Sequence, residues 1–333
     1  MLGARVVIWR IRNLPAWGTV VDVVSHWLAA THQGSGLLVN RNIKASTSAS
    51  AAFLALWFGN APNAAAQSTP SEPLHVAIEA LADQQSIEPG QTFLVALVER
   101  IQPGWHTYWV NPGDAGQATR LRWTLPSGYR VDEVQWPVPQ VFRSGPLVTY
   151  GYEGEVVLLQ KVHSPDRLSS APAKLSVEAQ WLACQDICIP EHGASQVTVR
   201  QEPIAGHHAP AASTALFTAA GERLPKPCPW STSLVVRGAS VVLTVHGIAR
   251  KLPAAAKVQF LPLIWGEIDN AAKQRTVRSG ADLLLTLARG DLRSAPLGGL
   301  DGVLVLGPGS GQLQGQGFLL HALASGTDAP RAR

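Results

Sequence analysis

Two of the three cysteines in this 333-residue chain, Cys184 and Cys188, lie four positions apart. They stand in the stretch Gln180-Trp-Leu-Ala-Cys-Gln-Asp-Ile-Cys-Ile-Pro-Glu-His192. Cysteine side chains can form a structural disulfide, bind a metal ion or exchange electrons through a reversible disulfide. The chemistry of the pair is therefore the first question that the sequence raises.

The spacing of the pair limits the geometry of a disulfide. Four residues of extended strand span about 13 Å, whereas bonded cysteines have Cα atoms roughly 4.4–6.8 Å apart. A bonded pair therefore requires a turn, for which Gln185-Asp186 is suited, with one strand ending at Cys184 and the next beginning at Cys188. So short a loop gives little stabilisation through the unfolded state, and exposed or strained disulfides are typically the labile or catalytic ones.

A metal site is the alternative, because His192 extends the pattern to Cys-x3-Cys-x3-His. Tetrahedral zinc needs a fourth ligand, whereas copper(I) accepts two thiolates. Glu191 or another histidine could complete the set, but the spacing selects none of them. A redox centre, a structural bridge and a metal site at Cys184, Cys188 and His192 all remain open at this point.

The N-terminal region indicates the compartment. Basic Arg41 and Lys44 precede a short apolar block at 51–58, which is followed by Ala64-x-Ala66. This order is typical of a secretory signal peptide, and the apolar block is far shorter than the ~20 residues of a membrane-spanning helix. We predict cleavage after Ala66 and export out of the cytoplasm, into a compartment where disulfides persist.

The formal net charge of +4 belongs to the leader. Residues 1–66 contain five basic residues and one acidic residue, so the 27 basic and 23 acidic residues of the whole chain fall to 22 of each. A neutral remainder lacks the basic face that binds nucleic acid. We therefore expect no nucleic-acid partner.

Short segments rich in Val, Leu and aromatic residues, separated by Pro- and Gly-containing turns, predict an all-β fold with two β-sandwich domains in tandem. The connection includes one expected helix at 211–222. The expected organisation is a leader at 1–66, a first sandwich at 67–204, a linker at 205–230, a second sandwich at 231–324 and a disordered tail at 325–333.

Four motifs resemble one known family. They are Trp-His-Thr-Tyr-Trp-Val-Asn-Pro-Gly-Asp-Ala-Gly at 105–116, Val-Gln-Trp-Pro-Val-Pro at 134–139, Gly-Pro-Leu-Val-Thr-Tyr-Gly-Tyr-Glu at 145–153 and Trp-Leu-Ala-Cys-Gln-Asp-Ile-Cys-Ile-Pro at 181–190. Together they resemble the N-terminal periplasmic domain of the DsbD-type thiol:disulfide interchange proteins, in particular the ScsB-like branch. The resemblance covers 74–201, with 228–323 similar to a second sandwich.

The resemblance implies immunoglobulin-like sandwiches and a redox role for Cys184 and Cys188. Such a domain takes electrons from a DsbD/ScsB-type membrane protein and passes them to periplasmic thioredoxin-fold proteins, in processes that include cytochrome c biogenesis and copper tolerance. It needs no cofactor. Longer family members continue into a membrane domain, so we expect either a separately encoded donor or a truncated product. The alternative function is a non-catalytic immunoglobulin-like module for protein interaction or copper handling.

The resemblance also draws attention to residues that would cover or tune the cysteine pair. Tyr150-Gly-Tyr152-Glu153 has the composition of a capping loop, and Asp114 and Glu153 are candidate proton carriers. An ordinary turn that packs on the sandwich is the alternative for the tyrosines, and an Asx turn is the alternative for Asp114. Cys188 is the cysteine that we expect to face the partner.

Overall fold

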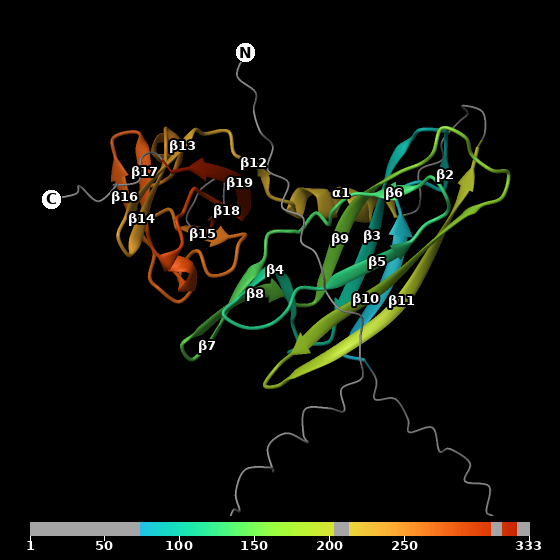
Figure 1. The fold of residues 1–333 in the computed structure, drawn as a ribbon, viewed down its shortest axis with the longest axis horizontal. Coiled ribbons are helices and arrows are strands. Elements are labelled where there is room, and N and C mark those ends of the chain that lie inside the picture. The colour runs from blue at the N-terminus through green and yellow to red at the C-terminus, as the bar shows by residue number, and fades with distance from the viewer. Residues whose placement is uncertain (1–73, 203–212, 308–314, 325–333) are drawn as a thin grey trace, which may run out of the picture. The chain divides into compact units, whose positions relative to one another are not determined.

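The structure, a computed structural model, describes residues 74–202, 213–307 and 315–324. The described part is all-β with one α-helix and two short 3-10 helices (Figure 1). The expected signal peptide and the expected C-terminal tail lie outside the described residues. No helix in these three ranges is long and apolar enough to cross a membrane.

The first sandwich contains two main sheets and a smaller third sheet. Their strand orders are β1-β3-β9-β6, β2-β11-β10-β5 and β4-β8-β7. The bounds are β1 (Val76–Ala82), β2 (Ser86–Ile87), β3 (Thr92–Ile101), β4 (Thr107–Gly113), β5 (Arg120–Thr124), β6 (Arg130–Val131), β7 (Gln140–Ser144), β8 (Leu147–Tyr152), β9 (Glu155–His163), β10 (Ala173–Cys184) and β11 (Cys188–Gln201).

The burial pattern of β10 and β3 explains how these sheets pack. Strand β10 alternates, with Leu175, Val177 and Ala179 buried and the residues between them partly or fully exposed, which is typical of a sheet with one covered face. Strand β3 is buried almost throughout because both of its faces are covered. Leu97 faces the core of the sandwich, whereas Val98 faces helix α1 (Thr214–Arg223).

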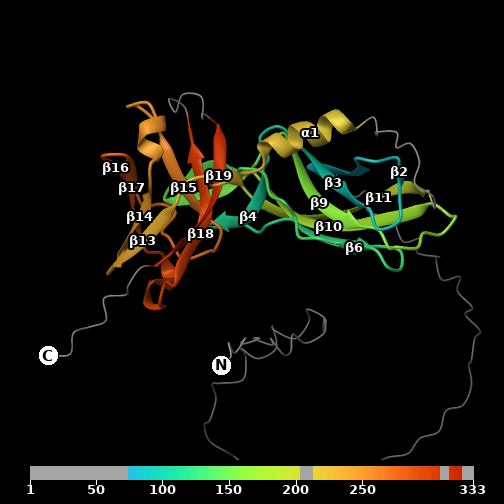
Figure 2. The ribbon, with the colours of Figure 1, turned by 90° about the horizontal axis from the view of Figure 1, so that it is seen from above.

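Helix α1 covers the outer face of the sheet that contains β3 and β9 (Figure 2). Phe217 and Ala220 are its buried residues, and they pack with Val98 and Leu159. The helix expected at 211–222 is therefore present, and it packs against the first sandwich. The domain and linker boundaries given above remain predictions.

The second sandwich consists of two four-stranded sheets that pack face to face around one core. Their strand orders are β12-β19-β18-β15 and β13-β14-β17-β16. Their bounds are β12 (Lys226–Pro227), β13 (Thr232–Arg237), β14 (Ser240–Val245), β15 (Val258–Pro262), β16 (Arg275–Ser279), β17 (Asp282–Ala288), β18 (Gly299–Leu306) and β19 (Gln316–Leu323). The 3-10 helices are η1 (Ile248–Lys251) and η2 (Asp291–Ser294). The predicted all-β tandem arrangement is confirmed.

The segment that the sequence suggested as a glycine-containing loop is strand β8 of a hairpin. Strands β7 and β8 pair from Gln140↔Gly151 to Ser144↔Leu147, and the turn residue Gly145 has a positive φ of 57°. Gly151 lies within this strand. The position requires glycine because a Cβ there would come within 2.0 Å of the Thr107 carbonyl oxygen. The glycine thus permits β8 to pair closely with β4, which is a structural role within a strand.

Candidate functional site

The cysteine pair closes the tip of the β10–β11 hairpin. Cys184 and Cys188 are partners in the strand register and form a disulfide with a Cα–Cα distance of 4.1 Å. The turn is held by a hydrogen bond from the Gln185 amide to the Ile187 carbonyl oxygen at 3.0 Å. The sequence-based expectation of a turn at Gln185-Asp186 between two strands is therefore confirmed.

The two sulfur-bearing residues differ strongly in exposure. Cys184 is 1% exposed, whereas Cys188 and its neighbour Ile187 are exposed at the hairpin tip. A thiol–disulfide exchange partner needs in-line access to one sulfur. The geometry therefore offers Cys188 to a partner protein and keeps Cys184 behind it.

Strand β4 and the residue before it form the wall beside the disulfide. The backbone of His106 exchanges two hydrogen bonds with Cys184, at 2.9 and 3.0 Å. Two residues later, on the same face of the strand, the Tyr108 hydroxyl lies 3.5 Å from Cys188 Sγ and 3.3 Å from His106 Nε2. One hydroxyl group therefore contacts both the exposed sulfur and an imidazole ring.

The protonation states in this wall follow from burial. Burial lowers the pKa of His106, against the opposing effect of the Glu153 charge, and burial raises the pKa of Tyr108. At neutral pH the imidazole is therefore mainly uncharged and the phenol keeps its proton. The Tyr108 hydroxyl can then donate to a thiolate at Cys188, which would favour the charged form of that thiol.

Phe142 of strand β7 completes the site, and sequence reasoning missed it. Its ring stacks on His106 with a centroid distance of 4.8 Å and an interplanar angle of 19°. The pattern Val-Phe-Arg-Ser-Gly-Pro-Leu-Val at 141–148 contained a usable signal, because two short strand-like runs flank a Gly-Pro turn. Reading this stretch as a hairpin would have pointed to Phe142.

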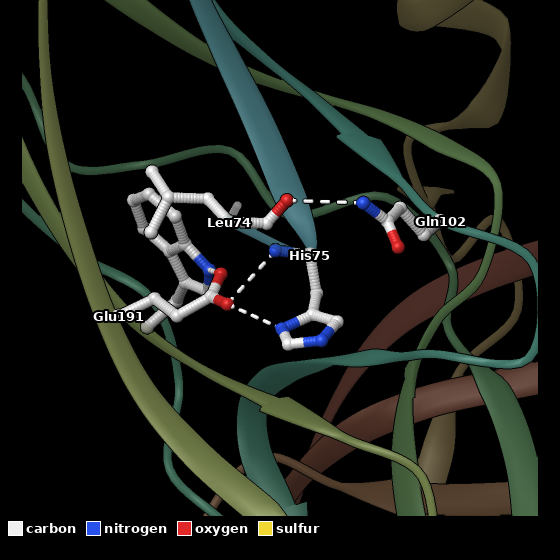
Figure 3. Close-up of polar contacts among 5 residues, drawn as sticks. Leu74, His75, Gln102 and Glu191 are labelled. Carbon is white, nitrogen blue, oxygen red and sulfur yellow. Dashed lines mark hydrogen bonds and ion pairs between the residues drawn. The ribbon is translucent and has the colours of Figure 1, made fainter. Parts of the chain in front are cut away.

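The buried carboxylate of Glu191 connects the β10–β11 hairpin to His75 (Figure 3). Glu191 is 6% exposed, and its Oε1 accepts hydrogen bonds from the His75 amide at 2.8 Å and contacts His75 Nδ1 at 2.7 Å. Its Oε2 accepts from Trp181 Nε1 at 2.9 Å. Glu191 therefore ties β11 to the residue that precedes β1 and to β10, and the His75 ring also stacks on Trp105 at 3.7 Å.

Two of the residues predicted to cap or tune the disulfide make their hydrogen bonds elsewhere. Tyr150 is fully buried, and its hydroxyl donates to Asn270 of the second sandwich at 3.1 Å. Asp114 accepts from the Val148 amide at 2.7 Å and from Asn270 Nδ2 at 2.8 Å. The structure therefore brings Tyr150 and Asp114 together with Asn270.

The other two predicted residues lie nearer to the disulfide. Tyr152 pairs with Thr107 in the β4–β8 register, and its buried hydroxyl donates to the Pro137 carbonyl oxygen at 2.8 Å. Burial raises the pKa of Tyr152 well above its usual value, and the nearby Glu99 carboxylate adds to the rise. Glu153 is exposed and influences the site through its charge on His106. The tuning roles of all four residues remain predictions.

The metal alternative required His192 to lie with the cysteines. His192 is exposed and pairs with Gln180, four residues along β11 from Cys188, which corresponds to about 13 Å of strand. Among the residues that the structure describes, no group of three or more His, Cys, Asp or Glu side chains could hold a metal ion.

Glu99 is a buried carboxylic acid behind the wall of the site. Thr107 donates to its Oε2 at 2.8 Å, and Oε1 has no hydrogen-bond partner among the described residues. Burial raises the pKa of Glu99 above its usual value of 4.5. As the pH rises, the Glu99 carboxyl group therefore loses its proton in the unfolded chain before it does so in the folded protein. The free energy of unfolding should fall from about pH 4.5 upward until the pH has passed the raised pKa of the folded state.

We expect the Glu99→Gln variant to be more stable than the unsubstituted protein at pH 7, because an amide cannot ionise. The gain should be on the order of 1 kcal/mol, since a difference of one pH unit in a carboxyl pKa corresponds to about 1.4 kcal/mol, or roughly 2–4 °C in melting temperature. Thermal unfolding between pH 4 and pH 8 should show a smaller decline with pH. The control is Glu178→Gln, which removes an exposed carboxylate of β10, and a decline in Glu99→Gln equal to that of the unsubstituted protein would contradict the prediction.

Comparison with known proteins decides the family of the first sandwich. A family model described as "Thiol:disulfide interchange protein DsbD, N-terminal" matches residues 77–199. Residues 77–199 belong to this family. The match includes Cys184 and Cys188, the wall at 106–108 and the hairpin that carries Phe142.

Solved structures show the fold of the chain. The N-terminal periplasmic domain of ScsB from Proteus mirabilis is similar at a TM-score of 0.56 and 19% identity, covering 77% of this chain and 96% of that one. A Porphyromonas gingivalis W83 protein of unknown function has 9% identity and a TM-score of 0.23, covering 75% of this chain and 99% of that one; this score is too low to support an argument. No curated protein sequence matches.

Proposed function

We propose that the protein is a periplasmic thiol:disulfide exchange component in which Cys184 and Cys188 cycle between dithiol and disulfide. The observation that carries this proposal is the unequal exposure of the pair: Cys188 is exposed beside the Tyr108 hydroxyl, whereas Cys184 is 1% exposed. A purely stabilising disulfide over so short a loop gains little from loop closure. The family of residues 77–199 supports the same chemistry.

In the proposed reaction, the Cys188 thiolate attacks one sulfur of a partner disulfide and releases the other partner sulfur as a thiolate. The Cys184 thiolate then attacks Cys188 Sγ, which re-forms the Cys184–Cys188 disulfide and releases the second partner thiol. Two electrons pass to the partner, which takes up two protons overall. The reverse reaction, with a dithiol donor, reduces the pair for the next cycle.

The proposed partners follow from the family. A membrane protein of the DsbD/ScsB type would supply the electrons, and a periplasmic thioredoxin-fold protein would receive them. Cytochrome c biogenesis and copper tolerance are the processes that such a relay would serve. Tyr108 would donate its hydroxyl hydrogen to the Cys188 thiolate, and Glu153 would adjust the charge state of His106.

The midpoint potential of the pair tests this function. Equilibration of the purified protein with mixtures of reduced and oxidised glutathione, followed by alkylation and mass measurement, should show both redox forms within the range of biological exchange proteins. Structural disulfides typically lie below about −300 mV. A pair that stays oxidised at that potential would contradict the proposal.

A copper-handling role for Cys184, Cys188 and His192 has less geometric support. A metal ligand must be a thiolate, whereas this pair is bonded, and His192 lies along the strand from it. Copper(I) bound stoichiometrically to the reduced protein, and lost in His192→Ala, would favour that role.

A further inference from the structure

The three-stranded sheet β4-β8-β7 connects the disulfide to the second sandwich. The end of the sheet near the disulfide carries Tyr108 and Phe142, and is adjacent to His106. The other end carries Asn111 and, immediately after β4, Asp114, which contact residues of the second sandwich. One small sheet therefore contacts both the redox pair and the other sandwich.

Asn270 is the central polar residue of the contact with the second sandwich. It is 6% exposed, accepts from the Tyr150 hydroxyl at 3.1 Å and donates to Asp114 Oδ1 at 2.8 Å. Asp114 Oδ2 in turn accepts from the Val148 amide at 2.7 Å. One side-chain amide thus connects β8 and the end of β4 to the second sandwich.

Further contacts strengthen this attachment. Asn111 Nδ2 donates to the Pro262 carbonyl oxygen at 2.8 Å. Leu261 and Val303 of the second sandwich belong to the same buried cluster as Trp109 and Tyr150. Tyr150 is fully buried, so water is poorly placed to replace the hydrogen bond that its hydroxyl donates to Asn270, whereas the exposed Asp114 can bind water instead. The loss of the Tyr150 bond should therefore affect strand β8.

The path from Asn270 to the redox pair is short. Tyr150 pairs with Val141, the residue before Phe142, and the residue after Tyr150 pairs with Tyr108. A shift of β8 at Tyr150 would therefore move the Phe142 ring relative to His106 and move Tyr108 relative to Cys188. These are the contacts that border the exposed sulfur.

We propose that the second sandwich positions the redox site, with Asn270 as a positioning residue that holds Phe142 and Tyr108 in place through the β4-β8-β7 sheet. The consequence for exchange rests on the proposed function. The second sandwich would then set the rate at which the disulfide is attacked.

The test compares Asn270→Ala, Phe142→Ala and the double variant in the full chain. The rate of disulfide reduction by excess dithiothreitol is measured for each, together with the midpoint potential against glutathione. We expect each single variant to react about fivefold faster, because Asn270→Ala loses the buried hydrogen bond to Tyr150 and Phe142→Ala loses the ring that stacks on His106. The rate increase in the double variant should be smaller than the product of the two single effects, because both changes act in part through the Phe142 contact.

Gln274→Ala is the matched control, because Gln274 hydrogen-bonds the Phe260 backbone twice within the second sandwich. It should change the melting temperature and leave the reduction rate unaltered. Tyr150→Phe, which removes only the hydroxyl, is the second probe should Asn270→Ala not fold. An unchanged rate in both Asn270→Ala and Tyr150→Phe, or rate changes that multiply in the double variant, would overturn the positioning role.

The two ideas fail in different ways. A midpoint potential in the structural range contradicts the proposed function, whereas the comparison of reduction rates still decides whether Asn270 controls access to the disulfide. A suitable potential with equal rates in all variants contradicts the positioning role alone.

Discussion

Cys184→Ser is expected to form a stable mixed disulfide with glutathione, whereas Cys188→Ser should form little. In Cys184→Ser the remaining thiol is exposed, and the second thiol that would release a bound partner is gone. In Cys188→Ser the remaining thiol is 1% exposed and reacts only after local opening of the hairpin. Since each 1.4 kcal/mol of opening costs a factor of ten, we expect the two rates to differ by about tenfold or more.

Both variants should be made together with Cys228→Ala, so that the third cysteine does not react. Cys228 is half-buried, and burial raises the pKa of its thiol. Intact-mass measurement after incubation with oxidised glutathione counts the adducts directly. Equal labelling of both variants, or faster labelling at Cys184, would contradict the assignment of Cys188 as the partner-facing residue.

Glu191→Ala is expected to lower the free energy of unfolding by about 3 kcal/mol. The substitution leaves Trp181 Nε1 and the His75 amide without their acceptor, and each unsatisfied buried donor costs roughly 1–3 kcal/mol. Thermal unfolding followed by tryptophan fluorescence should show a decrease of roughly 6–12 °C in melting temperature.

The exposed Glu178 of β10 provides the control for this prediction. Glu178→Ala removes the same charge and side-chain volume from the same hairpin, and should change the stability by less than about 0.5 kcal/mol. A loss in Glu191→Ala as small as in this control would mean that the buried carboxylate does not stabilise the hairpin.

Strands with continuous or alternating apolar residues could be predicted closely from the sequence. The apolar-rich runs at 92–100 and 155–163 form strands β3 (Thr92–Ile101) and β9 (Glu155–His163). The start of strand β11 was harder to predict, because Cys188-Ile-Pro-Glu-His-Gly lacks the alternating apolar pattern of a strand. Only the turn that a bonded cysteine pair requires indicated a strand from Cys188. This part of β11 pairs with β10 on one side only, because β2 joins it only at Arg200 and Gln201. Pro190 therefore lies on an edge of the sheet, where proline is tolerated.

The candidate site divides in the same way. The cysteine pair and its turn depend on residues that are neighbours in the chain, so the spacing of Cys184 and Cys188 was sufficient to predict the turn between them. The wall depends on residues brought together by strand pairing, such as His106 and Phe142, which are far apart in sequence. The cap role predicted for Tyr150 remains a prediction. The hydrogen bond from its hydroxyl to Asn270 joins residues 120 positions apart, and no local pattern encodes it.

The sequence by itself determined the all-β tandem architecture and the turn that joins the two cysteines, because local periodicity and short spacing set these features. The family of residues 77–199 was indicated by the resemblance of four motifs. Only the tertiary structure decided which cysteine is exposed, which side chains border it and how Asn270 of the second sandwich contacts the same sheet. The physical reason is that burial and cross-strand contacts depend on register between distant segments, where a single residue's shift turns a side chain to the opposite face.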